Sequence, residues 1–587
     1  MACVASSLLM SLLPFETLPA YKPRAFVPAG AKLTEWAAIE PLFDQLESRG
    51  AACQNVAELE RWLVDWNELT AVLSDEMDRR SIATTSHTDN AEAEQAYLYF
   101  VEQIDPKIKP RQFALERLLV AHPLAAELPR PRYTVLLRDA RNRVELFRNE
   151  NVALEAEEAK LSQQYMKLCG TLTVSFRGEE KTLEQMSKLL EEPDRELRRE
   201  AWEKVTTRRL RERETFEEQF EALLQLRERM AAHAGFANYR DYAFRRMGRF
   251  DYGPSDCETF HEAIAREVVP IMRRLEARRR ESLGLARLRP WDMDVDAQQR
   301  PPLRPFATAA ELAEGVQSVF DRLDSELAAG FRQMDALRML DLESRPGKAP
   351  GGYESTLAES RLPFIFMNAV GRQFDIEVLL HEAGHAFHAL AAREDDFFAY
   401  RQCPPIEFAE VASMSMELLG NDFLEPFYTP PEARRARRIH LERMIGALAL
   451  IAIGDAFQHW IYTHPEHTRS ERSAAWEALL DRFAPDLDWS GYEEVRRVSW
   501  HRHLHFFIVP FYFVEYGLAQ LGALQIWARF RQNRDEALAL YKSALALGGS
   551  RPLPELFAAA GCRFQFDAST IRSLMALVKA ELQLPLE

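Results

Sequence analysis

Apolar residues recur at three- and four-residue spacing along most of this sequence, a periodicity that is typical of amphipathic helices. The longest clear example, residues 195–233, follows Asp194, a residue type that caps helix N-termini, and ends before Gly235. Strand patterns are few. The clearest are residues 171–176, followed by an Arg-Gly pair that predicts a hairpin near 171–183, and residues 362–369. The sequence therefore predicts a mainly α protein with a small β-sheet.

Composition excludes several classes of protein. With 47% hydrophobic and 10% aromatic residues, the chain is too apolar to remain disordered. A net charge of −16 disfavours binding to nucleic acid, because an acidic surface repels phosphate. The six cysteines are far apart and form no CxxC pair, so neither disulfides nor a cysteine zinc site is indicated. A reducing compartment fits best, and we expect a cytoplasmic protein.

The N-terminus contains a short apolar run, residues 2–15, that is similar to the core of a signal peptide. The first basic residue is Lys22, whereas a secretory signal places positive charge before its apolar core. Translation could start at Met1 or at Met10, and the second start would remove most of the run. No other stretch of about 20 uncharged apolar residues exists, so we expect neither export nor a membrane span.

The most informative segment for chemistry is His381-Glu382-Ala-Gly-His385, an HExxH arrangement within a predicted helix. Residues four apart leave the same face of a helix, about one turn from each other. Two neutral imidazoles at this spacing can hold one zinc ion, and the carboxylate between them can act on water as a base. A similar segment at His261-Glu262 lacks the second histidine. The alternative interpretation of His381 and His385 is a pair of structural helix histidines.

A catalytic zinc needs a third protein ligand and an open fourth position. The pattern that supplies a third histidine from the same helix fails, because His388 and Ala391 occupy the positions where it needs glycine and histidine. A second helix is predicted to begin after Pro404-Pro405, and Glu407, Glu410 and Glu417 fall on one of its faces. Spacing alone does not choose the ligand among these three acids.

The HEAGH segment followed after 25 residues by Glu410 in an EVAS context resembles the thimet oligopeptidase and oligoendopeptidase F family of gluzincin metallopeptidases, in particular the bacterial oligoendopeptidase F-type enzymes. The resemblance extends from about residue 149 to the C-terminus. It implies that Glu410 is the third zinc ligand, with one Zn²⁺ per chain. It also implies two helical lobes, residues 1–190 and the catalytic residues 191–587, around a deep substrate channel.

Further site residues are expected on general chemical grounds and from the same resemblance. Glu417 is a candidate to orient a ligating imidazole, as outer carboxylates generally do in such sites. Attack on an amide places negative charge on its oxygen, and positioned donors stabilise that charge. The aromatic segment 500–523 offers His505, Tyr512 and Tyr516 for this role, and the family uses histidine and tyrosine side chains from this region. Those tyrosines could alternatively be core residues, since the segment is strongly apolar.

We expect residues 362–369 to form an edge strand to which a peptide substrate adds by main-chain hydrogen bonds, at Phe364, Ile365 and Phe366. Glu354 and residues 367–372 depart from the family pattern near this strand. These observations predict a zinc-dependent endopeptidase that hydrolyses short peptides, with Glu382 as general base and general acid. Two alternatives are another zinc hydrolase, such as an aminopeptidase or amidase, and a non-catalytic helical interaction protein.

Overall fold

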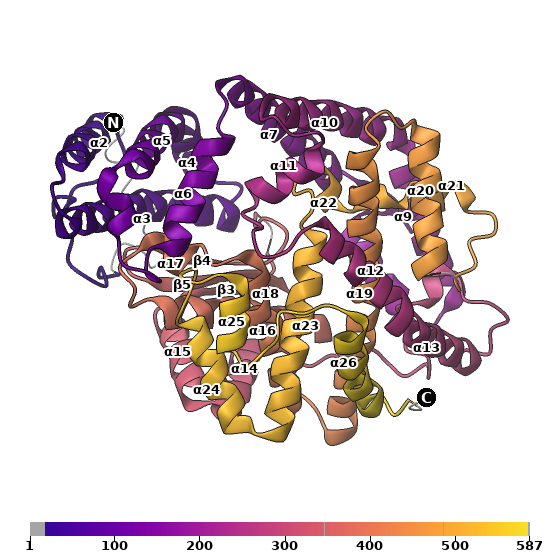
Figure 1. Ribbon diagram of the computed structural model, residues 1–587. Helices are drawn as coiled ribbons and strands as arrows, with labels where there is room; N and C mark the ends of the chain where they lie inside the picture. Colours follow the sequence, from indigo (N-terminus) through magenta and orange to yellow (C-terminus); the bar gives the residue numbers. More distant parts are fainter. Residues whose placement is uncertain (1–17, 346, 485, 585–587) are drawn as a thin grey trace. The chain divides into compact units, whose positions relative to one another are not determined.

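The computed structural model describes residues 18–345, 347–484 and 486–584 (Figure 1). The signal-like run at residues 2–15, with Met1 and Met10, lies outside these residues. The described chain is mostly helical with two small sheets, which confirms the predicted fold class. Contacts divide it into two compact units. Each unit is assembled from three separate segments of the chain. The predicted lobes are continuous segments, 1–190 and 191–587, and this division stays a prediction.

Unit 1 comprises residues 1–145, 304–437 and 522–564. Its first segment is a set of helices around a shared apolar core that includes Trp62, Leu63 and Leu115, all fully buried. The helices and strands of unit 1 are α2 (Trp36–Ala52), α3 (Val56–Ser86), α4 (Ala91–Tyr99), the π-helical turn η3 (Phe100–Ile104), α5 (Asp105–Ala121), the 3₁₀ turn η4 (Pro123–Glu127), α6 (Thr134–Leu146), α14 (Ala309–Leu323), α15 (Ser325–Ala336), β3 (Leu340–Glu343), β4 (Tyr353–Leu357), β5 (Leu362–Ala369), α16 (Gln373–Ala392), α17 (Phe398–Gln402), α18 (Ile406–Gly420), η7 (Asn421–Phe423), α24 (Arg534–Leu545) and α25 (Leu553–Ala559).

The sheet of unit 1 corrects the prediction of the substrate edge strand. Its strand order is β3-β5-β4, with β5 parallel to β3 and antiparallel to β4. Strand β5 is therefore central, and both of its main-chain edges are already paired. Phe364, Ile365 and Phe366 are almost fully buried. The physical reason is visible in the sequence, because a run that is apolar on both faces is typical of a central strand. The edge strand that follows β5 in the sheet is β4.

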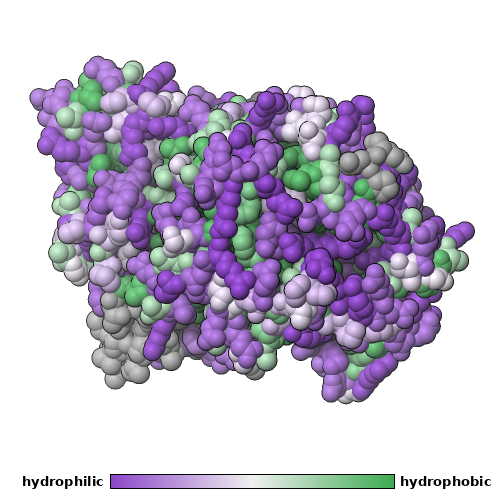
Figure 2. Space-filling view, turned by 90° about the horizontal axis from the view of Figure 1, so that it is seen from below, coloured by the Kyte–Doolittle hydropathy of each residue, from purple (hydrophilic) through white to green (hydrophobic). Residues whose placement is uncertain are grey.

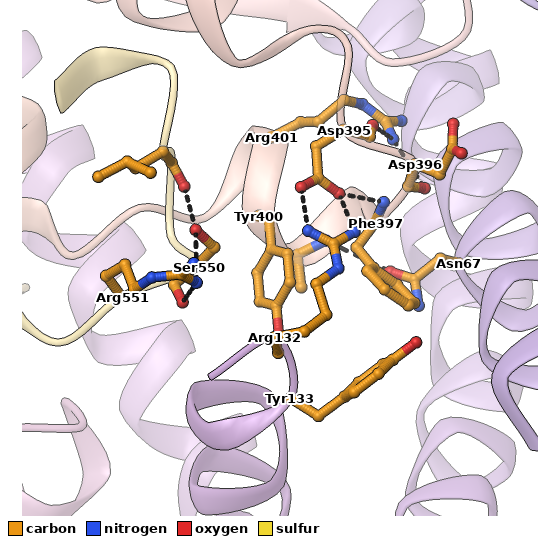
Figure 3. A network of polar contacts seen from close by, with 12 residues as sticks. Asn67, Arg132, Tyr133, Asp395, Asp396, Phe397, Tyr400, Arg401, Ser550 and Arg551 are labelled. Atoms are coloured by element: carbon orange, nitrogen blue, oxygen red, sulfur yellow. Dashed lines mark hydrogen bonds and ion pairs between the residues drawn. The ribbon is translucent and has the colours of Figure 1, made fainter. Parts of the chain in front are cut away.

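A polar network within unit 1 anchors the connection between α16 and α18 (Figure 3). Arg132, which precedes α6, pairs with Asp395, with Nη2 2.7 Å from Oδ1. Its guanidinium carbon lies 4.7 Å from the ring centroid of Phe397 and 5.0 Å from that of Tyr400. The Tyr400 hydroxyl donates a hydrogen bond to the main-chain oxygen of Arg132. The first helical segment thereby holds the residues that lie between the two helices of the candidate site.

Unit 2 comprises residues 146–303, 438–521 and 565–587. Strands β1 and β2 pair antiparallel, and Arg177 and Gly178 connect them. This hairpin lies within the segment for which the sequence predicts one. The elements of unit 2 are α7 (Asn149–Gly170), β1 (Thr173–Phe176), β2 (Glu179–Thr182), α8 (Leu183–Ser187), η5 (Lys188–Glu191), α9 (Arg195–Arg211), α10 (Arg213–His233), α11 (Tyr239–Arg246), α12 (Pro254–Glu267), α13 (Val269–Ser282), η6 (Pro290–Asp292), α20 (Arg469–Phe483), α21 (Glu493–Arg497), η8 (Ser499–Arg502), α22 (Leu504–Phe507) and α26 (Ala568–Glu581).

The structure has two helices, α9 and α10, where the sequence predicts one helix over residues 195–233, because the helical conformation is interrupted at Glu212. Two further helices, α19 (Pro430–Thr463) and α23 (Phe513–Gln532), contain boundaries between the units. An 18-residue window of α19 has the length and hydropathy of a membrane span, but 72% of that window is buried inside the protein. The face of the molecule in Figure 2 is largely hydrophilic, with hydrophobic residues in small patches.

Candidate metal centre

Helix α16 presents the two histidines of the HExxH segment. It begins where Asp375 accepts hydrogen bonds from the backbone amides of Val370 and Arg372, at 2.8 and 2.9 Å, which satisfies donors that a helix start leaves open. His381 and His385 lie one turn further along on the same face, with ring centroids 5.0 Å apart. The predicted helix is therefore present, and it places both imidazoles side by side.

Helix α18 packs directly against α16, and the two backbones approach closely at Gly384, the glycine of the HEAGH segment (Figure 1). A Cβ atom at Gly384 would lie 2.5 Å from Cα of Ser413 and 2.7 Å from the carbonyl oxygen of Ala412. Side chains cannot occupy that space, so only glycine permits this approach of the two backbones. The close packing brings Glu410 of α18 to the histidine pair.

The ligand atoms of His381, His385 and Glu410 lie within 4.8 Å of one another. Nε2 of His381 is 3.4 Å from Oε2 of Glu410, and Nε2 of His385 is 3.8 Å from the same oxygen. Around a tetrahedral zinc ion with bonds of about 2.0–2.1 Å, ligand atoms are about 3.3–3.4 Å apart. The two distances to Glu410 are therefore close to those of an assembled zinc site, and the donor set of two imidazoles and one carboxylate is one that zinc accepts.

Two further side chains of α18 fix the ligands in place. Oε1 of Glu417 lies 2.7 Å from Nδ1 of His381, on the side of the ring that faces away from Glu410. The Ser413 hydroxyl donates a 2.9 Å hydrogen bond to Oε2 of Glu410. Burial alone would lower the pKa of His381, but the hydrogen bond to Glu417 and the charges of Glu417 and Glu410 outweigh it and raise the pKa to about 9. Without a metal ion, a ring with this pKa carries a proton on both nitrogens at neutral pH. A cation would displace the proton on Nε2, and Glu417 would keep the proton on Nδ1.

His385 has the opposite electrostatic environment. Burial and the neighbouring imidazoles of His381 and His388 lower its pKa well below the ordinary value, so the ring is neutral at neutral pH. A neutral imidazole is the form that binds a metal ion.

Glu382 lies beside the ligands and is 8% exposed. Burial first, and then the charges of Glu410 and Glu417, raise its pKa to about 7, against the lowering effect of His381. A divalent cation among the ligands would oppose this rise. The backbone of Glu354, on edge strand β4, lies near the Glu382 carboxylate and has a smaller, lowering effect on its pKa.

The residues predicted to stabilise an oxyanion lie in unit 2 and are neighbours there. The ring centroid of His505 is 6.0 Å from that of Tyr512 and 5.8 Å from that of Tyr516, and the two tyrosine rings are 4.9 Å apart. Burial lowers the pKa of His505 to about 4, so its ring is neutral. Their action on a substrate stays a prediction.

Three residues of the centre were not identified from the sequence. Gly384 is signalled by its place in a helix interior, where glycine is unfavourable without a packing reason. Ser413 follows Glu410 by three residues, a spacing at which a hydroxyl reaches back along a helix, but that signal is weak. Glu354 departs from the family pattern, but nothing in the sequence indicates that it lies near Glu382. Glu407 is buried on α18 outside the candidate ligand group.

Comparisons with known proteins identify the family of the chain. A family model described as "Peptidase family M3" matches residues 188–576, and "Peptidase M3 N-terminal domain" matches residues 26–147. An "Oligoendopeptidase F homolog" of Lactococcus lactis is 24% identical over 311 residues, which is 51% of this chain and 49% of that protein. The chain thus matches about half the length of this curated relative.

Solved structures match almost the whole chain. A structure of PZ peptidase A with an inhibitor has a TM-score of 0.87 at 29% identity and covers 96% of this chain and 98% of its own. Oligoendopeptidase F of Enterococcus faecium shares the fold, with a TM-score of 0.60 at 16% identity, over 93% of this chain and 96% of its own. Because the family model spans well over half of the residues and includes both helices of the metal centre, the chain belongs to peptidase family M3.

Proposed function

We propose that this protein is a zinc-dependent endopeptidase that hydrolyses internal bonds of short peptides. The observation that carries the proposal is the convergence of His381, His385 and Glu410 from two helices, with Glu382 beside them. Membership of a peptidase family supports hydrolysis of peptides. The choice of zinc rests on the donor set and its spacing.

His381, His385 and Glu410 would hold the zinc ion, which would supply a Lewis acid for the peptide carbonyl and for water. Glu382 takes the proton of the attacking water and delivers it to the departing amine, so it acts first as base and then as acid. Its burial keeps the proton affinity high enough for this transfer. Glu417 holds the ring of His381 in place through Nδ1.

The sheet suggests where a peptide approaches. Strand β4 is an edge strand, and the backbone of its Glu354 lies near Glu382. A peptide that runs along the outer side of β4 would lie next to the base, with main-chain hydrogen bonds giving affinity without a strict requirement for side chains. Strand β4 therefore takes the role predicted for β5, because both main-chain edges of β5 are paired with β3 and β4.

The test is a digest of synthetic peptides that are acetylated at the N-terminus and amidated at the C-terminus, followed by mass spectrometry. We expect the wild type to cleave internal bonds of peptides below about 20 residues. The Glu382→Gln variant should lose at least about 100-fold in rate, because general base catalysis contributes a factor of that size or more. Equal rates in both proteins would refute the assigned base.

Glu407→Gln is the matched control, since it removes a buried carboxylate from α18 outside the candidate ligand group. It should retain both zinc and cleavage, whereas Glu410→Gln should lose zinc. Release of only unblocked N-terminal residues would indicate an aminopeptidase instead. A reconstituted wild type with far less than one zinc ion per chain would contradict the metal assignment.

A further inference from the structure

A second cluster of metal-binding side chains lies in unit 2. Cys257 and His261 are one turn apart on α12, and Asp455 and His459 are one turn apart on α19. Each pair therefore leaves one face of its helix. His261 belongs to the segment that begins like an HExxH motif but lacks the second histidine. In the fold, the complementary residues come from α19.

The geometry of this cluster is that of a ligand set. The ligand atoms of Cys257, Asp455 and His459 lie within 4.8 Å of one another. Nε2 of His459 is 3.4 Å from Oδ2 of Asp455, which is the separation of two ligands of one zinc ion rather than that of a hydrogen bond. Nε2 of His261 is 2.8 Å from the same oxygen and hydrogen-bonds it.

The polar side chains of the cluster are almost completely buried, which is unusual for such residues. Asp455 is 0% exposed and Cys257 is 1% exposed. Among the described residues, Oδ1 of Asp455 and both ring nitrogens of His459 have no hydrogen-bond partner. Buried polar atoms are nearly always paired with protein, water or an ion, so these three atoms need a partner that the chain itself does not supply.

The charges favour a divalent cation. Asp455 is a buried acid that lies against two imidazoles, with its Oδ2 2.8 Å from Nε2 of His261 and 3.4 Å from Nε2 of His459. A divalent cation would displace the thiol proton, and one carboxylate with one thiolate would balance its charge. The nearby Arg249 is balanced by Glu515, with Nη2 2.9 Å from Oε1.

Two aromatic rings cover the His459 side of the cluster. Aromatic rings of Phe244 and Phe511 meet the His459 ring edge to face, with centroids 5.8 and 5.6 Å away. An apolar shell of this kind excludes solvent and slows metal exchange. By contrast, the side chains of His381 and His385 are 24% and 20% exposed.

We propose that Cys257, Asp455 and His459 hold a second zinc ion with a structural role, and that His261 orients Asp455 by its hydrogen bond. Zinc is the cation of choice because the set combines sulfur, nitrogen and oxygen donors. The site would bind its metal during folding, since the finished structure encloses it. It is independent of the centre on α16 and α18, because it shares no residue with that centre.

The test is the zinc content of purified, folded chains. We expect about two zinc ions per chain in the wild type, about one in His385→Ala, about one in Cys257→Ser and none in the double variant. Zinc at the candidate centre of unit 1 should exchange with a chelator quickly, and the second zinc only on unfolding. One zinc ion in the wild type together with none in His385→Ala would overturn the proposal.

Cobalt gives a second readout that does not depend on the folding of Cys257→Ser. The His381, His385 and Glu410 set contains no sulfur, so a thiolate-to-cobalt charge-transfer band in the cobalt-loaded His385→Ala protein can arise only from a cysteine site. We expect that band, and we expect it to persist in Cys562→Ser, a control at another buried cysteine. Absence of the band would refute the site and indicate a hydrogen-bonded cluster that encloses water. Persistence of the band in Cys257→Ser would refute it by showing that another cysteine binds the cobalt.

Discussion

The contact at Gly384 allows the sharpest test of how the metal centre is built. In the Gly384→Ala variant, the new methyl carbon would lie 2.5 Å from Cα of Ser413. Ordinary contact begins at about 3.4 Å, so α16 and α18 would have to separate by about 0.9 Å at this point. The opposing atoms belong to the backbone of α18 and cannot rotate away.

A displacement of this size matters more for the metal than for the fold. Metal–ligand distances tolerate deviations of about 0.2 Å, and Glu410 moves with the backbone of α18. We expect zinc affinity to fall at least about 100-fold, which corresponds to about 2.7 kcal/mol. Overpacking of this kind costs about 1–3 kcal/mol of stability, and the better helix propensity of alanine offsets about 1 kcal/mol of that.

The assay is competition for zinc with a chromophoric chelator, with circular dichroism and the Tm of the metal-free protein as measures of folding. Gly446→Ala is the matched control, because a Cβ atom at that helical glycine of α19 would meet no atom of the described chain within 4 Å beyond its own helix. It should raise the Tm slightly and leave zinc affinity unchanged. A folded Gly384→Ala protein that binds zinc as tightly as the wild type would refute the argument.

Two further predictions concern carboxylates around the centre. Glu417→Gln should weaken zinc binding about 10- to 100-fold, because an outer carboxylate raises the basicity of the imidazole that it holds. Zinc affinity equal to that of the wild type in the same competition assay would contradict that role. Burial raises the pKa of Glu354 to about 8 from an ordinary 4.5, so its contribution to stability is complete below about pH 4.5 and is lost as pH rises to 8. In metal-free protein, the stability of Glu354→Gln relative to the wild type should therefore increase by about 1.4 kcal/mol for each pH unit between about pH 4.5 and 8. The measurement is the Tm of both proteins as a function of pH. A stability difference that does not change with pH would contradict a neutral Glu354 side chain in the folded protein.

The sequence predicted those parts of the centre that depend on local structure. The helix expected around the HExxH segment is α16, and a helix does follow Pro405. Helical spacing could not choose among Glu407, Glu410 and Glu417, because all three lie on one face of α18. That choice depends on the angle and distance between two helices, which Gly384 sets and which no periodicity contains.

The misplaced edge strand has a different cause. The sequence of Leu362–Ala369 identified a strand correctly but did not reveal its neighbours, because pairing is made with residues that lie before and after it in the chain. Its apolar character on both faces was the available signal for a central position. The break at Glu212 likewise has no breaker residue, so periodicity continues through it. The composition of the two units was beyond prediction because each depends on contacts between distant segments.

The short connection between α16 and α18 has a consequence for the order in which the protein is made. Glu410 follows His385 by only 25 residues, so little chain entropy is lost when the three ligands meet. A growing chain therefore carries the complete ligand set while residues 522–564 are still to be synthesised. That last segment of unit 1 then arrives on α18, where the Tyr541 hydroxyl donates a buried 2.8 Å hydrogen bond to the carbonyl oxygen of Ala412. The three candidate ligands can therefore meet before the unit closes, and the C-terminal helices then pack onto the helices that carry them.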